Sequence, residues 1–151
     1  MAPLIKKCCL AFAFLGAILA IVMGVGGYFD QQAMTWREPA KSALNAKSNL
    51  AVVYWSGDMG TKVGLARALL PTLSARGIPV LSVTSPALFS TPRDRAFVDD
   101  QVVQSVKFAL QRRGIERVAV VGDSFGADVL GAGLGQLPPP LRERVAAVVL
   151  L

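Results

Sequence analysis

The sequence contains no histidine, and its two cysteines, Cys8 and Cys9, stand close to the first residue. A serine nucleophile needs a base to remove its proton, and histidine is the usual one. The common serine–histidine pair is therefore excluded within these 151 residues. The rest of the chain is free of thiols, which is compatible with an oxidising compartment but does not require one. Both cysteines precede the apolar stretch described below, so they do not form a lipoprotein-type attachment signal.

The chain also lacks any long block of like charge, although its formal net charge is +6. Short basic clusters occur at Arg112-Arg113 and at Arg142 to Arg144, with no aromatic residues between them. This pattern favours a solvated surface and no nucleic-acid partner, with attraction to an anionic membrane surface as a second interpretation. A G-x-x-x-x-G-K-S/T motif is absent, which disfavours nucleotide binding.

Apolar surface, by contrast, is abundant. Mean hydropathy is +0.49, and much of the excess lies between Cys8 and Phe29, where no charged residue occurs. As a helix at about 1.5 Å per residue, this run would reach roughly 33 Å, enough to cross a hydrocarbon core of about 30 Å. We interpret it as an uncleaved anchor, with a cleaved signal peptide as the alternative. Lys6 and Lys7 precede the run, so we expect a single membrane pass with the amino terminus in the cytoplasm and the domain exported, or a free exported protein if the peptide is removed.

The pattern divides the chain into three regions. Residues 1–29 form the anchor. Residues 30–49 are polar and mixed in charge, and they are interpreted as a juxtamembrane linker with Trp36 at the membrane interface. Residues 50–151 form one domain, in which apolar runs alternate with stretches of helical periodicity.

This alternation predicts an α/β fold with a parallel sheet, right-handed crossovers and flanking helices. The expected strands run from Leu50 to Trp55, from Val80 to Thr84, from Val118 to Val121 and from Val145 to Leu151. The first helix between them should be kinked or ended by Pro71, and the second should begin with Thr91 as its N-cap.

The most informative stretch follows the third of these strands. Gly122, Asp123, Ser124, Phe125 and Gly126 match the pattern G-x-S-x-G between a buried strand and a helix. Glycines two residues either side of the serine let the two backbones approach closely, which holds the hydroxyl above the sheet edge near unpaired N–H groups. Ser124 is therefore the candidate nucleophile, and an N-capping serine in a glycine-rich turn is the alternative.

A second group of residues should reach the same edge, because the carboxyl ends of parallel strands gather on one side of a sheet. Here those ends carry Ser124, Ser85 and the loop that contains Asp58 and Met59. A backbone N–H from this loop and one from Phe125 would form an oxyanion hole. No metal and no cofactor are expected.

These motifs resemble those of the VirJ-type bacterial virulence protein family, a branch of the α/β-hydrolase fold. The family's Ser-Gly-Asp-Gly-Gly loop is similar to residues 56–60, and its Gly-Tyr-Ser-Phe-Gly-Ala-Asp elbow is similar to residues 122–128. Weaker matches are the Gly-Val-Pro-Val turn at residues 77–80, the Thr-Pro helix start at residues 91–92 and the Leu-Pro pair at residues 137–138. The similarity covers about residues 50–151.

The chain departs from the family pattern at three places. Asp123 stands where the family has tyrosine, and Met59 and Thr61 replace the glycine and tryptophan of the first loop. The loop from Ser85 to Ser90 lacks the Asp-Ser-Leu-Arg-Tyr pattern and retains Phe89 alone. Substrate recognition is the property that these differences concern.

The resemblance implies an exported, membrane-anchored serine hydrolase-like protein that acts on acyl or aminoacyl esters of phospholipids. It gives Ser124 the role of nucleophile and places Asp58, Met59 and Phe125 around the oxyanion. Anionic or aminoacylated phospholipids and the inner membrane are then the expected partners. The role of Asp128 is left open between a family function and a helix cap or ion pair.

In this fold an acid and a histidine follow the elbow in chain order, and neither appears in that order before Leu151. We therefore expect the chain to be the N-terminal part of a truncated hydrolase. The alternative is a catalytically inactive fragment that serves as an interaction module. In both cases the strand from Val145 to Leu151 would form an exposed apolar edge, which a protein partner would cover.

Overall fold

Five strands form one sheet in a computed structural model that describes residues 2–40 and 48–151. The strand order is β1-β3-β2-β4-β5. The strands are β1 (Met34–Arg37), β2 (Leu50–Trp55), β3 (Val80–Val83), β4 (Arg117–Gly122) and β5 (Val145–Leu150). All neighbours pair in parallel except β1, which runs antiparallel to β3. The predicted α/β sheet is confirmed, with an antiparallel edge strand in addition.

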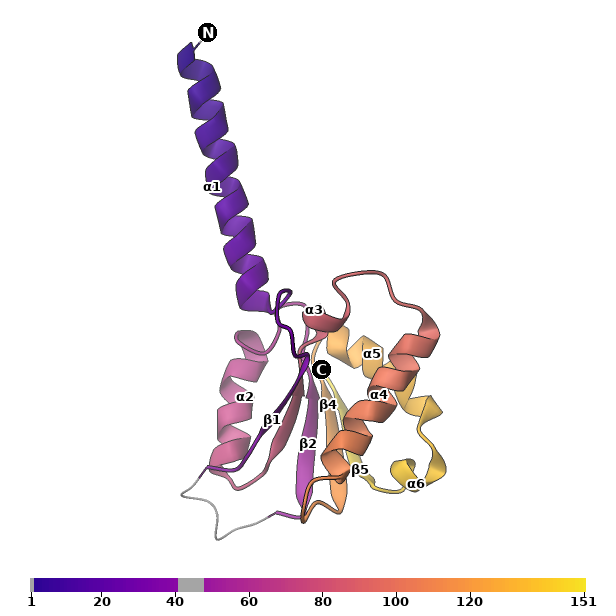
Figure 1. Cartoon of the computed structure of the whole chain (residues 1–151). Helices are drawn as coiled ribbons and strands as arrows, with labels where there is room; N and C mark the ends of the chain where they lie inside the picture. The colour runs from indigo at the N-terminus through magenta and orange to yellow at the C-terminus, as the bar shows by residue number, and fades with distance from the viewer. Residues whose placement is uncertain (1, 41–47) are drawn as a thin grey trace.

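Helices cover both faces of the sheet. Figure 1 shows α2 on one side and α4 with α5 on the other, while α1 projects away from the globular part. The helical elements are α1 (Ala2–Gly26), α2 (Gly64–Ala75), α3 (Ser85–Leu88), α4 (Arg95–Leu110), α5 (Phe125–Gly133), the 3-10 turn η2 (Leu134–Gln136) and α6 (Pro139–Arg142).

Strand β2 shows how the two faces are built. Its side chains alternate, so Val53 and Trp55 join the core beneath α4 and α5, while Val52 and Tyr54 pack against α2. Burial on both faces explains why β2 is apolar along its whole length. The pairing of β2 with β4, from Leu50 opposite Arg117 to Trp55 opposite Gly122, brings the ends of these two strands together.

The interpretation of residues 30–49 as a linker is wrong for the part that the structure describes. Met34–Arg37 forms the edge strand β1, and Met34 lies opposite Val83. Trp36 packs against the core and lies beneath the guanidinium of Arg112, 5.3 Å from the ring centroid, instead of at a membrane interface. Hydrogen bonds to β3 satisfy the backbone N–H and C=O groups of this segment. The local hydrophobicity of the sequence does not reveal this pairing. Residues 41–47 lie outside the described residues.

Two helix boundaries also differ from expectation. Asp94, not Thr91, caps α4, because its carboxylate accepts a hydrogen bond of 2.8 Å from the N–H of Phe97. Pro71 lies inside α2, which continues to Ala75. Burial of Leu70 against β2 and β3 stabilises α2 despite the missing N–H of the exposed Pro71.

Helix α1 includes the long apolar run. Its stretch from Lys7 to Gly26 has a mean hydropathy of 2.7, and its residues are exposed or half-buried as far as Val25. The helix ends in a Schellman motif: Gly27 has φ +84°, and the N–H groups of Gly27 and Tyr28 donate to the carbonyls of Gly24 and Met23. The apolar helix is long enough to cross a membrane, as the sequence indicated.

Candidate active site

The turn between β4 and α5 places Ser124 in a strained conformation. Its φ is 51° and its ψ is −122°, and it is the one non-glycine residue with positive φ in the described part of the chain. Such a conformation costs about 1 to 3 kcal/mol, and it persists only where the surroundings enforce it. The side chain is exposed, and its hydroxyl makes no hydrogen bond within residues 2–40 and 48–151.

The two glycines of the elbow explain how the turn is enforced. A Cβ on Gly126 would lie 2.7 Å from the carbonyl oxygen of Ser56 and would overlap that of Trp55. A Cβ on Gly122 would lie 2.6 Å from the Cα of Ala127. The start of α5 therefore presses directly on the end of β2, and no larger residue fits at either position.

The loop after β2 lies beside the serine. A Cβ on Gly57 would be 3.1 Å from the Cβ of Ser124, so the two backbones are in direct contact. Asp58 and Met59 follow with exposed side chains, and a bond of 3.0 Å from the N–H of Gly60 to the carbonyl of Gly57 closes the turn.

Unpaired backbone donors are available around this point. Among the described residues, the N–H groups of Asp58, Met59 and Phe125 have no hydrogen-bond acceptor. Phe125 begins α5, where N–H groups are free and the helix dipole favours negative charge. The structure thus brings the predicted nucleophile and the three predicted oxyanion residues to one edge of the sheet.

Buried serines hold the loop in place. Ser56 and Ser85 are both fully buried, and the N–H of Ser85 donates to Ser56 Oγ at 3.0 Å. In return, Ser85 Oγ donates to the carbonyl of Ser56, and Ser56 Oγ donates to that of Gly57 at 3.1 Å. Ser85 is therefore a structural residue that ties the end of β2 to the start of α3.

Asp123 is held by Tyr54, a residue that no sequence motif singles out. The hydroxyl of Tyr54 donates to Asp123 Oδ2 at 3.1 Å, and the N–H of Asp123 donates to the carbonyl of Trp55 at 3.0 Å. Burial raises the pKa of Tyr54 well above its ordinary value, and the charge of Asp123 and this hydrogen bond raise it further. The β2–β4 register, which is not visible in the sequence, was needed to find this pair.

Aromatic side chains form a wall next to the nucleophile. The ring of Phe125 meets that of Phe89 edge to face at 5.2 Å, and Phe89 meets Phe97 at 6.0 Å. These rings connect the elbow to α3 and α4 and provide an apolar surface beside Ser124.

The carboxylates of α4 have partners of their own. Asp99 pairs with Arg95 at 2.7 Å, and Asp100 accepts from Gln104 at 3.2 Å. Asp128 is exposed in the first turn of α5, and its side chain makes no ion pair or hydrogen bond within the described residues. Within that part of the chain, no group of three or more metal-ligating side chains occurs either.

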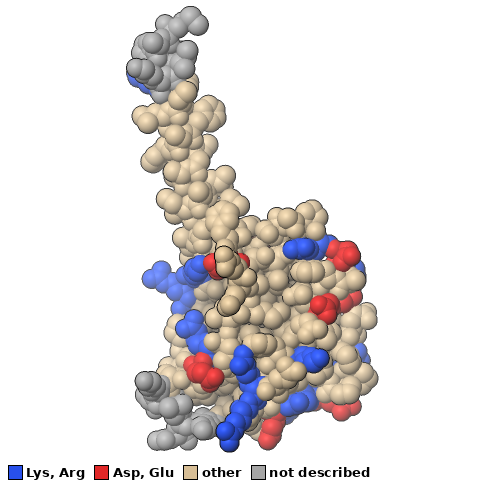
Figure 2. Space-filling view, in the orientation of Figure 1, with Lys and Arg blue, Asp and Glu red and all other residues tan. Residues whose placement is uncertain are grey.

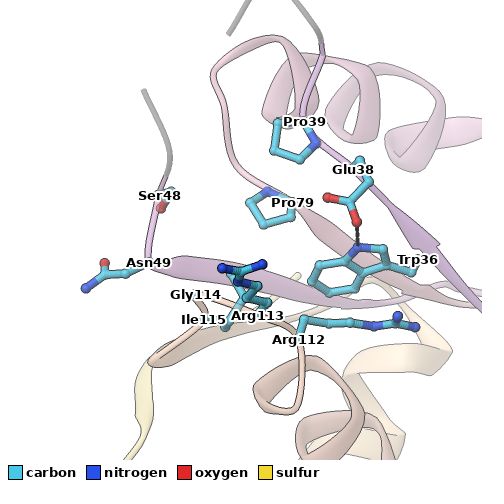
Figure 3. A pocket seen from close by; sticks show the side chains of 10 residues that line it. All are labelled: Trp36, Glu38, Pro39, Ser48, Asn49, Pro79, Arg112, Arg113, Gly114 and Ile115. Carbon is cyan, nitrogen blue, oxygen red and sulfur yellow. Dashed lines mark hydrogen bonds between the residues drawn. The ribbon is translucent and has the colours of Figure 1, made fainter. Parts of the chain in front are cut away.

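A cavity lies at the opposite end of the sheet. It measures about 660 Å³, and Figure 3 shows it between Trp36, Pro79 and Arg112, with Asn49 at the start of β2. These residues border the amino ends of the parallel strands, whereas Ser124 stands at a carboxyl end. The cavity is therefore separate from the candidate active site.

Comparison with known proteins settles the family. A family model described as "Bacterial virulence protein (VirJ)" matches residues 49–151. The chain belongs to the VirJ family. The family resemblance noted in the sequence is thereby confirmed. No curated protein matches this chain in sequence.

A solved structure shows the same fold as this VirJ family member. It is described as "Alpha/Beta hydrolase fold protein of unknown function" and aligns with a TM-score of 0.52 at 18% sequence identity. The alignment covers 68% of this chain and 35% of that protein, so the chain spans about a third of its relative's length. The similarity confirms the α/β-hydrolase-like fold.

Proposed function

We propose that this VirJ family member is a serine hydrolase-like protein whose nucleophile is Ser124. The observation that carries the proposal is the strained, exposed Ser124 between Gly122 and Gly126. A solvent-facing hydroxyl held at φ 51° has no structural use, since it caps nothing and makes no hydrogen bond in the described residues. A nucleophile elbow does require this geometry.

The reaction we propose is acyl transfer from an ester. Ser124 Oγ attacks the carbonyl carbon, and the electron pair of the C=O bond moves onto its oxygen. The N–H groups of Phe125 and of the Asp58–Met59 turn stabilise that oxyanion. Collapse of the intermediate breaks the ester bond, and the departing alkoxide takes the proton that the base removed from Ser124 and leaves as the alcohol. The acyl-serine that remains is hydrolysed by water, which returns a proton to Ser124 Oγ.

Removal of the serine proton is the missing step. General-base catalysis contributes roughly 10²- to 10⁴-fold in rate, and these 151 residues contain no histidine to supply it. The base is therefore proposed to lie outside this sequence. Without it, Ser124 retains oxyanion stabilisation but lacks activation.

We further propose that α1 anchors the protein in the inner membrane, with the domain in the periplasm and acyl or aminoacyl esters of phospholipids as substrates. The apolar stretch from Lys7 to Gly26, exposed or half-buried as far as Val25, supports anchoring. A cleaved signal peptide is the alternative for the same segment. Net charge of +6 favours an anionic lipid surface as the partner.

One observation favours a second function, that of an interaction module. Strand β5 lies at the edge of the sheet, and Val148, Val149 and Leu150 are 41 to 49% exposed. Leu151 is 61% exposed, so the apolar edge extends to the last residue. An uncovered apolar edge strand is a template for pairing with another chain. We propose that a protein segment covers this edge.

The nucleophile is tested by supplying the missing base. Purified full chain is treated with a fluorophosphonate probe with and without added imidazole, which replaces the absent histidine. We expect weak labelling alone, stronger labelling with imidazole, and none in Ser124→Ala or in unfolded chain. No labelling of Ser124 under either condition would contradict the nucleophile role. Strong labelling and ester turnover without imidazole would show that the account of the missing base is wrong.

A further inference from the structure

The end of α1 packs against the loop that flanks Ser124. A Cβ on Gly60 would overlap the carbonyl of Gly26, whose carbon lies 2.9 Å away. A Cβ on Gly26 would lie 3.6 Å from the carbonyl oxygen of Asp58. The base of the apolar helix and the turn that carries the unpaired N–H groups of Asp58 and Met59 are therefore in direct contact.

Residues on both sides constrain the contact between the end of α1 and the turn at Gly60. The Schellman motif at Gly27 fixes the direction in which the chain leaves α1, and a Cβ on Gly27 would lie 2.6 Å from Thr84 Cγ2. The N–H of Thr84 then donates to the carbonyl of Ala33 at 2.8 Å, just before β1 joins the sheet. Lys62 pairs with Asp30 at 3.1 Å across the same junction. Helix α1 is thus joined to the carboxyl edge of the sheet without a flexible linker.

The length of α1 determines how far this edge stands from a bilayer. The stretch from Lys7 to Gly26 contains 20 residues, of which Lys7 alone is charged. As a helix it spans about 30 Å, the thickness of the hydrocarbon core. Figure 2 shows charged atoms near the far end of the projecting helix and none from there until the globular part begins. Gly26 must then lie at the boundary of the core, and the headgroup layer beyond it is only about 5 to 8 Å deep.

Exposed apolar side chains surround the same junction. Phe29 follows the end of α1 and is 65% exposed, and Met59 is 51% exposed beside Gly60. Large exposed apolar side chains next to a membrane-spanning segment fit the boundary between headgroups and acyl chains. The Lys62 side chain, which pairs with Asp30 at this junction, is 52% exposed, and a lysine near a membrane surface is attracted to anionic lipid.

We propose that the carboxyl edge of the sheet, around Met59 and Ser124, rests on the lipid surface from which α1 emerges. The inference rests on the proposed anchoring by α1, but not on hydrolysis. Lipid headgroups would meet Ser124 without leaving the bilayer, because Gly57 touches Ser124 and Gly60 touches Gly26. Met59 stands where the family loop has a glycine, which would add no apolar surface. Its side chain is then in contact with the membrane.

The test places a fluorescent reporter on either end of the domain. In full-length chain with Cys8→Ser and Cys9→Ser, an NBD label is attached at Met59→Cys or at Gln111→Cys, which follows α4 near the amino edge. The protein is reconstituted in phosphatidylcholine–phosphatidylglycerol vesicles that contain a headgroup nitroxide lipid. We expect loss of most emission at position 59 and little loss at position 111. Equal emission at both positions would overturn the proposal.

Two glycine variants distinguish the helix contact from backbone strain. Gly60 and Gly64 have φ values of +68° and +61°, but a Cβ on Gly64 would meet nothing within 4 Å. Gly60→Ala should therefore restore much of the emission at position 59, while Gly64→Ala should leave the quenching unchanged. Equal quenching in parent, Gly60→Ala and Gly64→Ala would show that the contact with α1 does not hold the edge on the membrane.

Anchoring itself is measured separately by carbonate extraction of the same vesicles. Protein that resists extraction but shows no quenching at position 59 overturns the docked edge and leaves the anchor in place. Protein that is extracted contradicts the anchor. A blue shift at position 59 without nitroxide quenching would mean that protein, not lipid, covers Met59, which also overturns the proposal. None of these readouts depends on activity at Ser124.

Discussion

Ser85 and Ser124 hold equivalent places in the sheet, each in the turn that follows a parallel strand and leads into a helix. Ser85 is fully buried, and its N–H and hydroxyl both bond to Ser56. Ser124 is exposed, has positive φ, and its hydroxyl bonds to nothing in the described part of the chain. One turn uses its serine to hold two strands together, whereas the other holds its serine out to solvent at a cost in stability. Position at a carboxyl edge therefore does not by itself make a serine a nucleophile.

The largest loss of stability is expected from removing the close approach of α5 to β2, which enforces the strained turn at Ser124. Gly126→Val should lower the free energy of unfolding by more than about 4 kcal/mol, because the added side chain overlaps the carbonyls of Trp55 and Ser56. Denaturant unfolding followed by circular dichroism measures the loss. Gly131→Val, in the same helix with nothing within 4 Å of its Cβ, is the matched control and should change little. Similar losses in both variants would contradict the close approach.

A smaller effect is expected at the structural serine. Ser85→Ala removes the hydroxyl that donates to the buried carbonyl of Ser56, so the unfolding free energy should fall by about 1 to 3 kcal/mol. Ser124→Ala removes a hydroxyl without a partner and should stay within about 0.5 kcal/mol of the parent. Comparing the two denaturation midpoints under identical conditions checks this. A larger loss from Ser124→Ala would reverse the roles assigned to the two serines.

At neutral pH, a loss no larger than that from Ser85→Ala is expected at the tyrosine that holds the elbow. Tyr54→Phe should cost about 1 kcal/mol, since one hydrogen bond to Asp123 is lost while the ring stays packed. The pKa of Tyr54 is raised in the folded state, so the neutral phenol is favoured. The contribution of Tyr54 to the free energy of unfolding is complete at pH values below its pKa in the unfolded chain, about 10. It is lost as the pH rises toward the pKa of the folded state.

Unfolding curves at increasing pH measure this contribution. The parent should lose stability above about pH 10, and Tyr54→Phe should lose less over the same range. If the free energy of unfolding of the two proteins falls equally with rising pH, the pKa of Tyr54 does not differ between the folded and the unfolded chain.

The local parts of the site could be predicted because they depend on neighbours in sequence. Glycines spaced two residues either side of Ser124 specify a tight strand-to-helix turn, and the apolar runs at β2, β4 and β5 specify strands. Ser85 was placed at the right edge, but its burial depends on Ser56, which is distant in sequence. The Tyr54–Asp123 pair likewise depends on the register between β2 and β4, and the residue pattern within either strand does not encode that register.

The sequence by itself determined the elbow, the apolar helix and the alternation that makes an α/β sheet, because each follows from side-chain size and periodicity along a short segment. Tertiary structure alone decided that Met34–Arg37 is a strand, since this short segment is stabilised by backbone pairing with β3 and by packing of Met34 and Trp36 on a core formed by distant residues. It also decided that Gly26 and Gly60 meet. Two glycines permit such a contact, but only the folded chain brings the base of α1 to the edge that carries Ser124.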